Sequence, residues 1–180
     1  MKRLACIAGA AMLCCTVLTG CEEEKKTKKL SSYQMKSKIT AENTASKSIY
    51  TSIQATITDM NAEDVNMSGL GGVYIMKGKD FQFDEAPGKD GALKDKLYYR
   101  MSIYFPEIVK LDQVSFELQE FGGNYPDIRL LGVAVEKTDD KTDTDIYGAH
   151  PNQMTVDVHK KIKSIEDALA YAETGSLKSK

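Results

Sequence analysis

The sequence predicts an α+β fold, in which a long N-terminal amphipathic helix packs on an antiparallel β-sheet with short additional helices. The helix is indicated by apolar residues that recur every three or four positions, at Ile49, Ile53, Ile57 and Met60. The sheet is indicated by residues 114–121, which alternate strictly between apolar and polar side chains. A Gly-Gly-Asn turn and a second apolar run at 128–135 complete a predicted β-hairpin.

The long helix is expected over residues 33–60. Ala45 and Tyr50 widen its apolar face. The opposite, polar face is expected to carry Lys47, Ser52, Thr56 and Asp59. Serine and threonine are modest helix formers, so packing against the rest of the fold has to stabilise this helix.

Two shorter elements are expected next. Residues 71–76 are a strand candidate, and residues 90–105 have helical spacing up to Pro106, which ends a helix at the preceding residue. The apolar face of this second helix consists of Leu93, Leu97, Tyr98, Met101 and Tyr104. Tyr98 and Tyr104 are therefore expected in the core, with Tyr99 off that face. The alternative is an aromatic surface for glycans.

The C-terminal part of the chain is expected to contain an acidic loop at 139–145, a last strand at 154–158 and a final helix. Ser164 is a good N-cap for that helix, with Asp167 three residues later, and Gly175 is a good C-terminal stop. The tail 176–180 is expected to be frayed.

The N-terminus has the three parts of a secretory signal: Lys2 and Arg3, an apolar run over residues 4–18, and small residues before a charged stretch. The run ends in Leu18-Thr19-Gly20-Cys21. This tetrapeptide resembles the lipobox of bacterial lipoproteins. The resemblance implies cleavage before Cys21 and acylation of Cys21 with diacylglycerol and palmitate. The alternatives are secretion with release, or a retained anchor, although fifteen apolar residues are fewer than the ~20 that span a bilayer.

The expected organisation is therefore a signal peptide at 1–20, a charged flexible tether at 21–32, one domain at 33–175 and the tail. The expected location is the extracytoplasmic face of the cell membrane, with the chain anchored there by lipid. The lysines of the tether are an alternative contact for anionic headgroups.

The positions of the cysteines limit the thiol chemistry that is expected of the processed chain. Cys6, Cys14 and Cys15 fall in the expected signal peptide, so a processed chain keeps Cys21 alone, with no disulfide, thiol nucleophile or zinc site. Removal of Lys2 and Arg3 leaves 22 basic residues against 26 acidic ones, and such a balance gives no reason to expect nucleic acid as a partner.

Two segments resemble type IV pilin-like proteins of Gram-positive anaerobes. Residues 41–60 are similar to the helix that follows the membrane segment in those proteins, and residues 144–152 are similar to a late loop that leads to a Tyr-Pro pair. The resemblance implies a pilin-like head over residues 40–160. A pilin also has an unbroken apolar N-terminal helix, which the expected lipid signal and tether replace here. The resemblance therefore implies a head fixed to the membrane that does not assemble through that helix.

No catalytic signature is found, and no cofactor is expected. The best candidate for a metal site is the acidic loop, where Asp139, Asp143 and Asp145 are candidate calcium ligands, but the EF-hand spacing fails and a solvated turn is the favoured interpretation. The two histidines, His150 and His159, lack the spacing of a metal site.

Three function classes remain. The favoured class is an extracytoplasmic interaction, adhesion or assembly-accessory module with a protein or cell-wall glycan as partner. This class agrees best with the expected lipid anchor, the tether and the small size of the domain. A small solute-binding lipoprotein of a transporter is the alternative, and a hydrolase ranks last. The membrane itself, reached through the lipid on Cys21, is the other expected partner.

Overall fold

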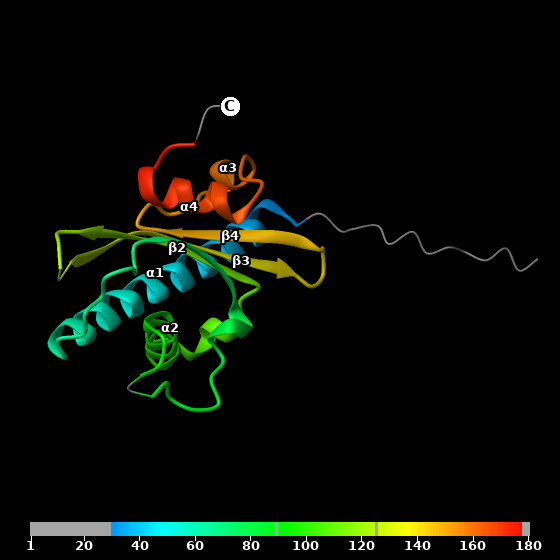
Figure 1. Ribbon diagram of the computed structural model, residues 1–180. Helices are drawn as coiled ribbons and strands as arrows, with labels where there is room; N and C mark the ends of the chain where they lie inside the picture. The colour runs from blue at the N-terminus through cyan, green and yellow to red at the C-terminus, as the bar shows by residue number, and fades with distance from the viewer. Residues whose placement is uncertain (1–29, 89, 125, 178–180) are drawn as a thin grey trace, which may run out of the picture.

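The computed structural model describes residues 30–88, 90–124 and 126–177. The expected α+β fold is confirmed: four antiparallel strands form one sheet in the order β1-β2-β3-β4. Figure 1 shows α1 and α2 below this sheet and α3 and α4 above it. The molecule is thus a sheet between two helical layers, with α1 running along its lower face.

Helix α1 spans Ser32–Ala62, close to the expected bounds. Ser31 caps it: the Ser31 hydroxyl accepts from the Gln34 N–H at 3.2 Å, and the Gln34 side chain accepts from the Ser31 N–H at 2.9 Å. Leu30 packs against the core just before this cap, so residues 30–32, expected in the tether, belong to the fold. The predicted apolar face is confirmed, since all four of its members are buried: Ile49, Ile53, Ile57 and Met60.

The predicted polar face of α1 is wrong at two positions. Ser52 and Thr56 are buried, because α2 packs against this side of the helix. The Ser52 hydroxyl donates to the Met101 carbonyl of α2 at 3.3 Å. Small side chains therefore let the two helices approach, and α1 is enclosed by the sheet on one side and by α2 on another.

Strands β1 (Gly72–Lys77), β2 (Gln113–Phe121) and β3 (Asp127–Asp139) form an antiparallel meander. The predicted hairpin is its β2–β3 part, and the strand candidate at 71–76 is β1, whose pairing with β2 the sequence did not predict. A register shift between Glu117 and Leu118 marks a β-bulge in the β2–β3 ladder. The 3-10 helix η1 (Gly78–Phe81) follows β1 and buries Phe81.

Helix α2 spans Leu93–Tyr104, and the 3-10 helix η2 (Pro106–Lys110) follows it. Tyr98 packs against the core as expected, edge-on to the Tyr74 and Phe81 rings. The expectation for Tyr104 is wrong, because this side chain is 48% exposed and its hydroxyl donates to the Asp59 carboxylate. The helix ends at Tyr104, and Phe105 turns inward against the core instead.

The last strand was predicted in the wrong place. β4 spans Thr144–His150, whereas the expected strand at 154–158 is replaced by the short helix α3, Val156–His159. The Thr155 hydroxyl caps α3 by accepting from the Val158 N–H at 3.3 Å. Helix α4 (Ile165–Thr174) confirms the predicted caps, with Ser164 at its start and Gly175, at φ 68°, just past its end.

The core consists of two apolar clusters on either side of the sheet. The larger one lies between the sheet and the lower helices and includes Val133 and Val135 of β3. Ala134, between them, belongs to the second cluster, which is built around α4 and is joined by Ile39 from the start of α1. Within the described residues, no helix is both long enough and apolar enough to span a bilayer.

Candidate functional site

The residues expected to carry the lipid anchor, Leu18, Thr19, Gly20 and Cys21, lie outside the described residues. The fold that follows them has a sharply defined start. Leu30 is half-buried, and the Ser31 cap begins α1, whose blue N-terminal end lies toward the right in Figure 1. The expected lipid attachment point, Cys21, therefore lies ten positions before Ser31, the N-cap of α1.

The acidic loop forms the tight β3–β4 turn. The Asp143 and Thr142 N–H groups donate to the Asp139 carbonyl at 2.8 and 3.0 Å, and Asp143 adopts a φ of 50°. The Asp139 carboxylate pairs with Lys38 of α1 at 2.7 Å and accepts from the Thr142 hydroxyl at 2.6 Å. These contacts hold the pKa of Asp139 below its usual value.

Two of the three candidate calcium ligands, Asp139 and Asp145, have carboxylates engaged in other contacts. The Asp145 carboxylate accepts from the Thr138 hydroxyl at 3.0 Å, across the hairpin, and Asp139 faces Lys38. Over the described stretches of chain, no three His, Cys, Asp or Glu side chains gather into a group that would hold a metal ion. The segment is a turn between β3 and β4, but Asp139 and Thr142 are buried in internal polar contacts, whereas the favoured interpretation of the sequence expected a solvated turn.

His150 is the last residue of β4. His159, on α3, lies beside Asp145 near the start of that strand. The His150 ring packs edge-on against Tyr50 of α1, with ring centroids 4.7 Å apart. His159 of α3 is buried, and its Nε2 lies 3.1 Å from the Asp145 carbonyl. Burial lowers the pKa of both imidazoles, more than the nearby groups raise that of His159.

A second pair of titratable groups lies across β3 and β4, where Glu136 faces Tyr147 in the ladder. Burial raises the pKa of the Glu136 carboxyl, and it raises that of the Tyr147 hydroxyl as well, with further help from the charge of Glu136. The two side chains share a hydrogen bond within the sheet. Side chains with strongly shifted pKa values are common in enzyme active sites. Glu136 and Tyr147, however, lie in the packed layer between sheet and helix, where they support the structure.

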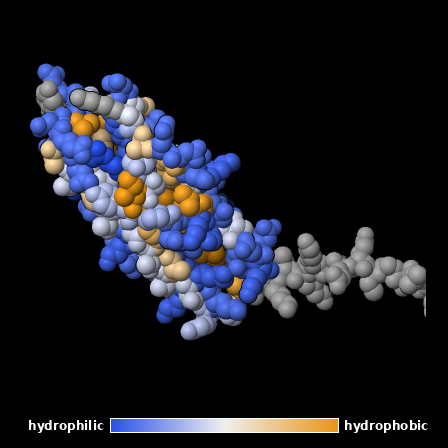
Figure 2. All heavy atoms as spheres, turned by 90° about the horizontal axis from the view of Figure 1, so that it is seen from below, coloured by the Kyte–Doolittle hydropathy of each residue, from blue (hydrophilic) through white to orange (hydrophobic). Residues whose placement is uncertain are grey.

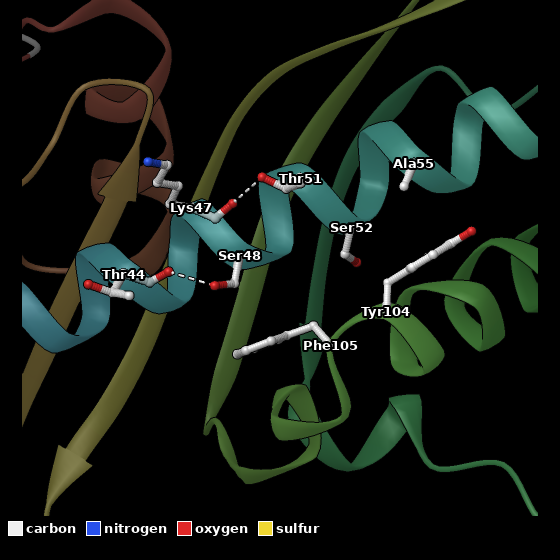
Figure 3. Close-up of a pocket in the computed structure, with 8 residues that line it drawn as sticks. All are labelled: Thr44, Lys47, Ser48, Thr51, Ser52, Ala55, Tyr104 and Phe105. Atoms are coloured by element: carbon white, nitrogen blue, oxygen red, sulfur yellow. Dashed lines mark hydrogen bonds between the residues drawn. The ribbon is translucent and has the colours of Figure 1, made fainter.

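An open groove between α1 and the end of α2 is the best candidate for a binding site, and we call it the α1–α2 groove. Its volume is about 360 Å³. In Figure 3, α1 forms one wall, and Tyr104 and Phe105 form the other. Eight residues line it: Thr44, Lys47, Ser48, Thr51, Ser52, Ala55, Tyr104 and Phe105.

The α1 wall of the groove carries several hydroxyl groups. The hydroxyls of Thr44, Ser48 and Thr51 donate to α1 carbonyls four residues earlier, at 2.9 to 3.1 Å, which leaves their oxygen lone pairs available as acceptors. Lys47 also lines the groove, but its ammonium group points away from Tyr104 and Phe105 in Figure 3. The eight lining residues include no carboxylate, imidazole or thiol.

Ionic contacts at the far end of α1 fix the position of α2. Arg100 pairs with Glu63 at 2.6 Å, and Tyr104 binds Asp59 nearby. The contact with Arg100 lowers the pKa of Glu63, and the contact with Asp59 raises that of Tyr104. Figure 2 shows this lower face as mostly hydrophilic, with small separate groups of hydrophobic side chains.

Sequence reasoning did not identify the α1–α2 groove, because it depends on how α2 crosses α1. The signal in the sequence was the run of serine and threonine on α1, which was assigned to a solvated face. A continuous row of small side chains is typical of close helix contact as well as of exposure, and only the packing distinguishes the two.

Comparisons of this chain with protein-family models, with curated proteins and with solved structures find no match.

Proposed function

We propose that the protein is a lipid-anchored module of the extracytoplasmic membrane face, with a pilin-like head that binds a protein or cell-wall glycan, as an adhesin or an accessory of an assembly machine. The observation that carries this proposal is the Leu18-Thr19-Gly20-Cys21 tetrapeptide at the end of a short apolar run. Two or more acyl chains give stable attachment without a membrane-spanning helix.

The start of the fold agrees with a tethered domain. Ten residues separate Cys21 from Ser31, which allows a reach of at most about 35 Å in an extended chain. The domain is therefore held near the lipid surface while its far end, at the α1 C-terminus, points away from the anchored end (Figure 1). The pilin-like character rests on residues 41–60 and 144–152, and the packing of α1 along an antiparallel sheet supports it.

The α1–α2 groove is the proposed binding surface. Hydroxyl groups on one wall and the aromatic rings of Tyr104 and Phe105 on the other are groups that recognise sugar hydroxyls or peptide amides. The groove also supports the second candidate, a small solute-binding lipoprotein, because 360 Å³ falls in the usual range of small-ligand pockets.

Lipidation is tested by labelling cells with a tagged fatty acid and separating membranes from soluble material. Cys21→Ser is expected to lose the label and leave the membrane fraction. Cys15→Ser, a matched cysteine change in the same segment, is expected to keep both. Membrane attachment of Cys21→Ser, or mass spectrometry that finds Cys21 unmodified, would exclude the lipoprotein.

Binding is tested by cross-linking in living cells, followed by identification of what is captured. Thr51→Trp fills the α1–α2 groove and is expected to reduce capture, whereas Thr58→Trp, an exposed threonine of the same helix outside the groove, is the control. Capture of pilus or secretion components, or of cell-wall glycan, supports the module. Capture of permease subunits, together with thermal stabilisation by a small solute, supports the second candidate instead.

A further inference from the structure

The hydroxyl groups of the α1–α2 groove share one property, because each of them already donates its hydrogen to a main-chain carbonyl. Thr44, Ser48 and Thr51 donate to carbonyls of α1. Ser52 donates to the Met101 carbonyl of α2 at 3.3 Å. A hydroxyl that donates in this way keeps only its oxygen lone pairs for a ligand. The hydroxyls of the α1 wall therefore offer a ligand hydrogen-bond acceptors and no donor.

The remaining side-chain donors that line the groove are the Tyr104 hydroxyl and the Lys47 ammonium. The Tyr104 hydroxyl donates to the Asp59 carboxylate, so its hydrogen is occupied as well. The Lys47 ammonium points away from the two aromatic rings in Figure 3. Among the eight lining residues, no side chain therefore directs an unoccupied donor into the space between α1 and these rings.

The charge at the Tyr104 end of the groove is negative. The contact between Asp59 and the Tyr104 hydroxyl places the Asp59 carboxylate beside the aromatic wall. Arg100 and Glu63 pair with each other at 2.6 Å, so their charges largely cancel. Lys47 lies twelve positions before Asp59, about 18 Å along the helix axis. Salt screens a charge over ~8 Å at physiological ionic strength, so Lys47 has little effect at this end.

The groove also has apolar surface for a carbon chain. Tyr104 and Phe105 provide aromatic rings on one wall, and Ala55 provides a methyl group on the other. In Figure 3, the Ser48 and Ser52 side chains point toward the rings, so acceptor oxygens and rings border the same space. Aromatic rings attract cations to their faces. Together these features suit a ligand that has an alkyl stem and ends in a cation with hydrogen-bond donors.

We propose that the α1–α2 groove binds a lysine side chain of a partner protein. The lysine ammonium has three donors and no acceptor, and therefore matches a wall whose hydroxyls only accept. Its carbon stem lies against Tyr104 and Phe105, and its ammonium donates to the Ser48 and Ser52 oxygens. Arginine fits less well, because its planar donors match carboxylates and phosphates, whereas these hydroxyls are separate acceptors. This inference rests on the proposed role of the groove as a binding surface and names the group that it binds.

Sugars and anions match the groove less well. Each sugar hydroxyl both donates and accepts, and the α1 wall satisfies only its donor. A carboxylate or phosphate has acceptors alone, so it would face the hydroxyl oxygens and the Asp59 charge without a donor. Because the groove is open, it suits a side chain that stays attached to its own main chain outside. The complementary groups therefore favour a polypeptide lysine.

The test uses the full-length protein purified from membranes in detergent, and a short blocked peptide with one lysine between glycines. Nuclear magnetic resonance is expected to show saturable shifts of the Ser48 and Ser52 amide signals. Acetylation of the lysine removes its charge, and trimethylation keeps the charge but removes the donors. Both modified peptides are expected to bind about tenfold more weakly. Equal binding of the trimethylated peptide, or no binding of the parent peptide, would overturn the proposal.

Protein variants test the acceptors and the charge separately. Ser48→Ala removes one acceptor and is expected to weaken binding of the lysine peptide about fivefold. Thr58→Ala is the matched control, because the Thr58 hydroxyl donates to a carbonyl four residues earlier, at 2.9 Å, outside the groove. Asp59→Asn is expected to weaken binding about threefold, whereas Asp140→Asn, at an exposed aspartate of the β3–β4 turn, should leave it unchanged. Equal loss in a variant and its control would contradict the assigned site.

Failure of this inference differs from failure of the proposed function. Loss of lipidation in wild-type cells would exclude the proposed lipoprotein but would leave binding of the lysine peptide unaffected. A neutral oligosaccharide that shifts the Ser48 signal, when the lysine peptide does not, would keep the groove as a binding surface and exclude the lysine. A concentration-dependent dimer that Ser48→Ala weakens would assign the groove to a second copy of this chain and overturn the partner protein.

Discussion

At the residue scale, Asn43 shows how one buried amide joins distant parts of the chain. Its Oδ1 accepts from the Ala149 and Met154 N–H groups, both at 3.0 Å, and its Nδ2 donates to the Met154 carbonyl at 2.8 Å. Three main-chain groups that are buried near the end of β4 thus depend on a side chain of α1. In the sequence this asparagine looks like one more polar position on a polar-rich helix, because its partners are more than a hundred residues away.

Replacing Asn43 is therefore expected to be costly. Asn43→Ala leaves three buried main-chain groups without partners and should lower the free energy of unfolding by about 2–4 kcal/mol. Urea denaturation measures the change. Asn61→Ala, at an exposed asparagine of the same helix, serves as the control and should cost less than about 1 kcal/mol. Equal costs for the two variants would contradict the role assigned to Asn43.

His159 makes stability depend on pH. Burial lowers its pKa below the ordinary 6.5, so the unfolded chain binds a proton more readily than the folded one. The free energy of unfolding contributed by His159 should therefore be fully present above pH 6.5 and decline as pH falls below it. His159→Gln should remove that decline, as measured by urea midpoints between pH 7.5 and 5 (about one unit either side of the ordinary value).

His150, whose pKa burial also lowers, acts in the same sense as His159, whereas two carboxyl groups act in the opposite sense. Burial raises the pKa of Glu42 and Glu136, so their contribution declines as pH rises. The difference between wild type and His159→Gln isolates the histidine. Parallel curves for the two proteins would show that His159 does not titrate differently on folding.

At the scale of elements, the sequence predicted those whose patterns are local. The isoleucine spacing of α1, the alternation of β2, and the Ser164 and Gly175 caps of α4 depend on neighbours within one turn or one pleat. β4 was missed because two of its residues fit contacts with α1: Gly148 leaves room for the helix main chain, and the polar His150 packs against Tyr50. The α1–α2 groove was missed for the same reason, since it depends on how elements meet.

Gly148 is where α1 and β4 meet most closely. A Cβ at this position would lie 2.1 Å from the Glu42 carbonyl carbon and 2.6 Å from the Asn43 nitrogen, both main-chain atoms that cannot move aside. Gly148→Ala should therefore lower the free energy of unfolding by more than about 3 kcal/mol. Gly123→Ala, where a Cβ would meet nothing within 4 Å, is the control for thermal denaturation. A stable Gly148→Ala would mean that the helix sits farther from the sheet.

The β3–β4 turn should be insensitive to metal ions. Lys38 already occupies the Asp139 carboxylate, so neither calcium nor a chelator is expected to change the melting temperature. Lys38→Met should destabilise the turn. Because this change frees the Asp139 carboxylate, calcium should stabilise this variant more than it stabilises the wild-type protein. A rise in the melting temperature of the wild-type protein with millimolar calcium would restore the loop as a metal site.

At the scale of the whole molecule, the two apolar clusters share strand β3 and helix α1, which contributes Ile53 to one and Ile39 to the other. Val133 and Val135 of β3 enter the larger cluster, and Ala134 between them enters the cluster around α4. Neither cluster can lose its packing without disturbing the strand that both share. The domain should therefore unfold as one cooperative unit.

Truncations in either cluster test this expectation. Ile53→Ala removes a fully buried side chain below the sheet, and Leu169→Ala removes one above it. Each should lower the free energy of unfolding by about 2–5 kcal/mol, with far-ultraviolet and near-ultraviolet circular dichroism still reporting one shared midpoint. Separate midpoints in either variant would show two independent cores.

The position of α1 also sets how the domain responds to mechanical load. The helix begins at the end nearest the expected anchor and runs along the sheet, while β1 lies at the sheet edge (Figure 1). A force applied at the start of α1 and along the sheet would act roughly parallel to the helix and the strands. Such a force would load the ladder hydrogen bonds and the α1 interface in shear, all at once rather than one after another.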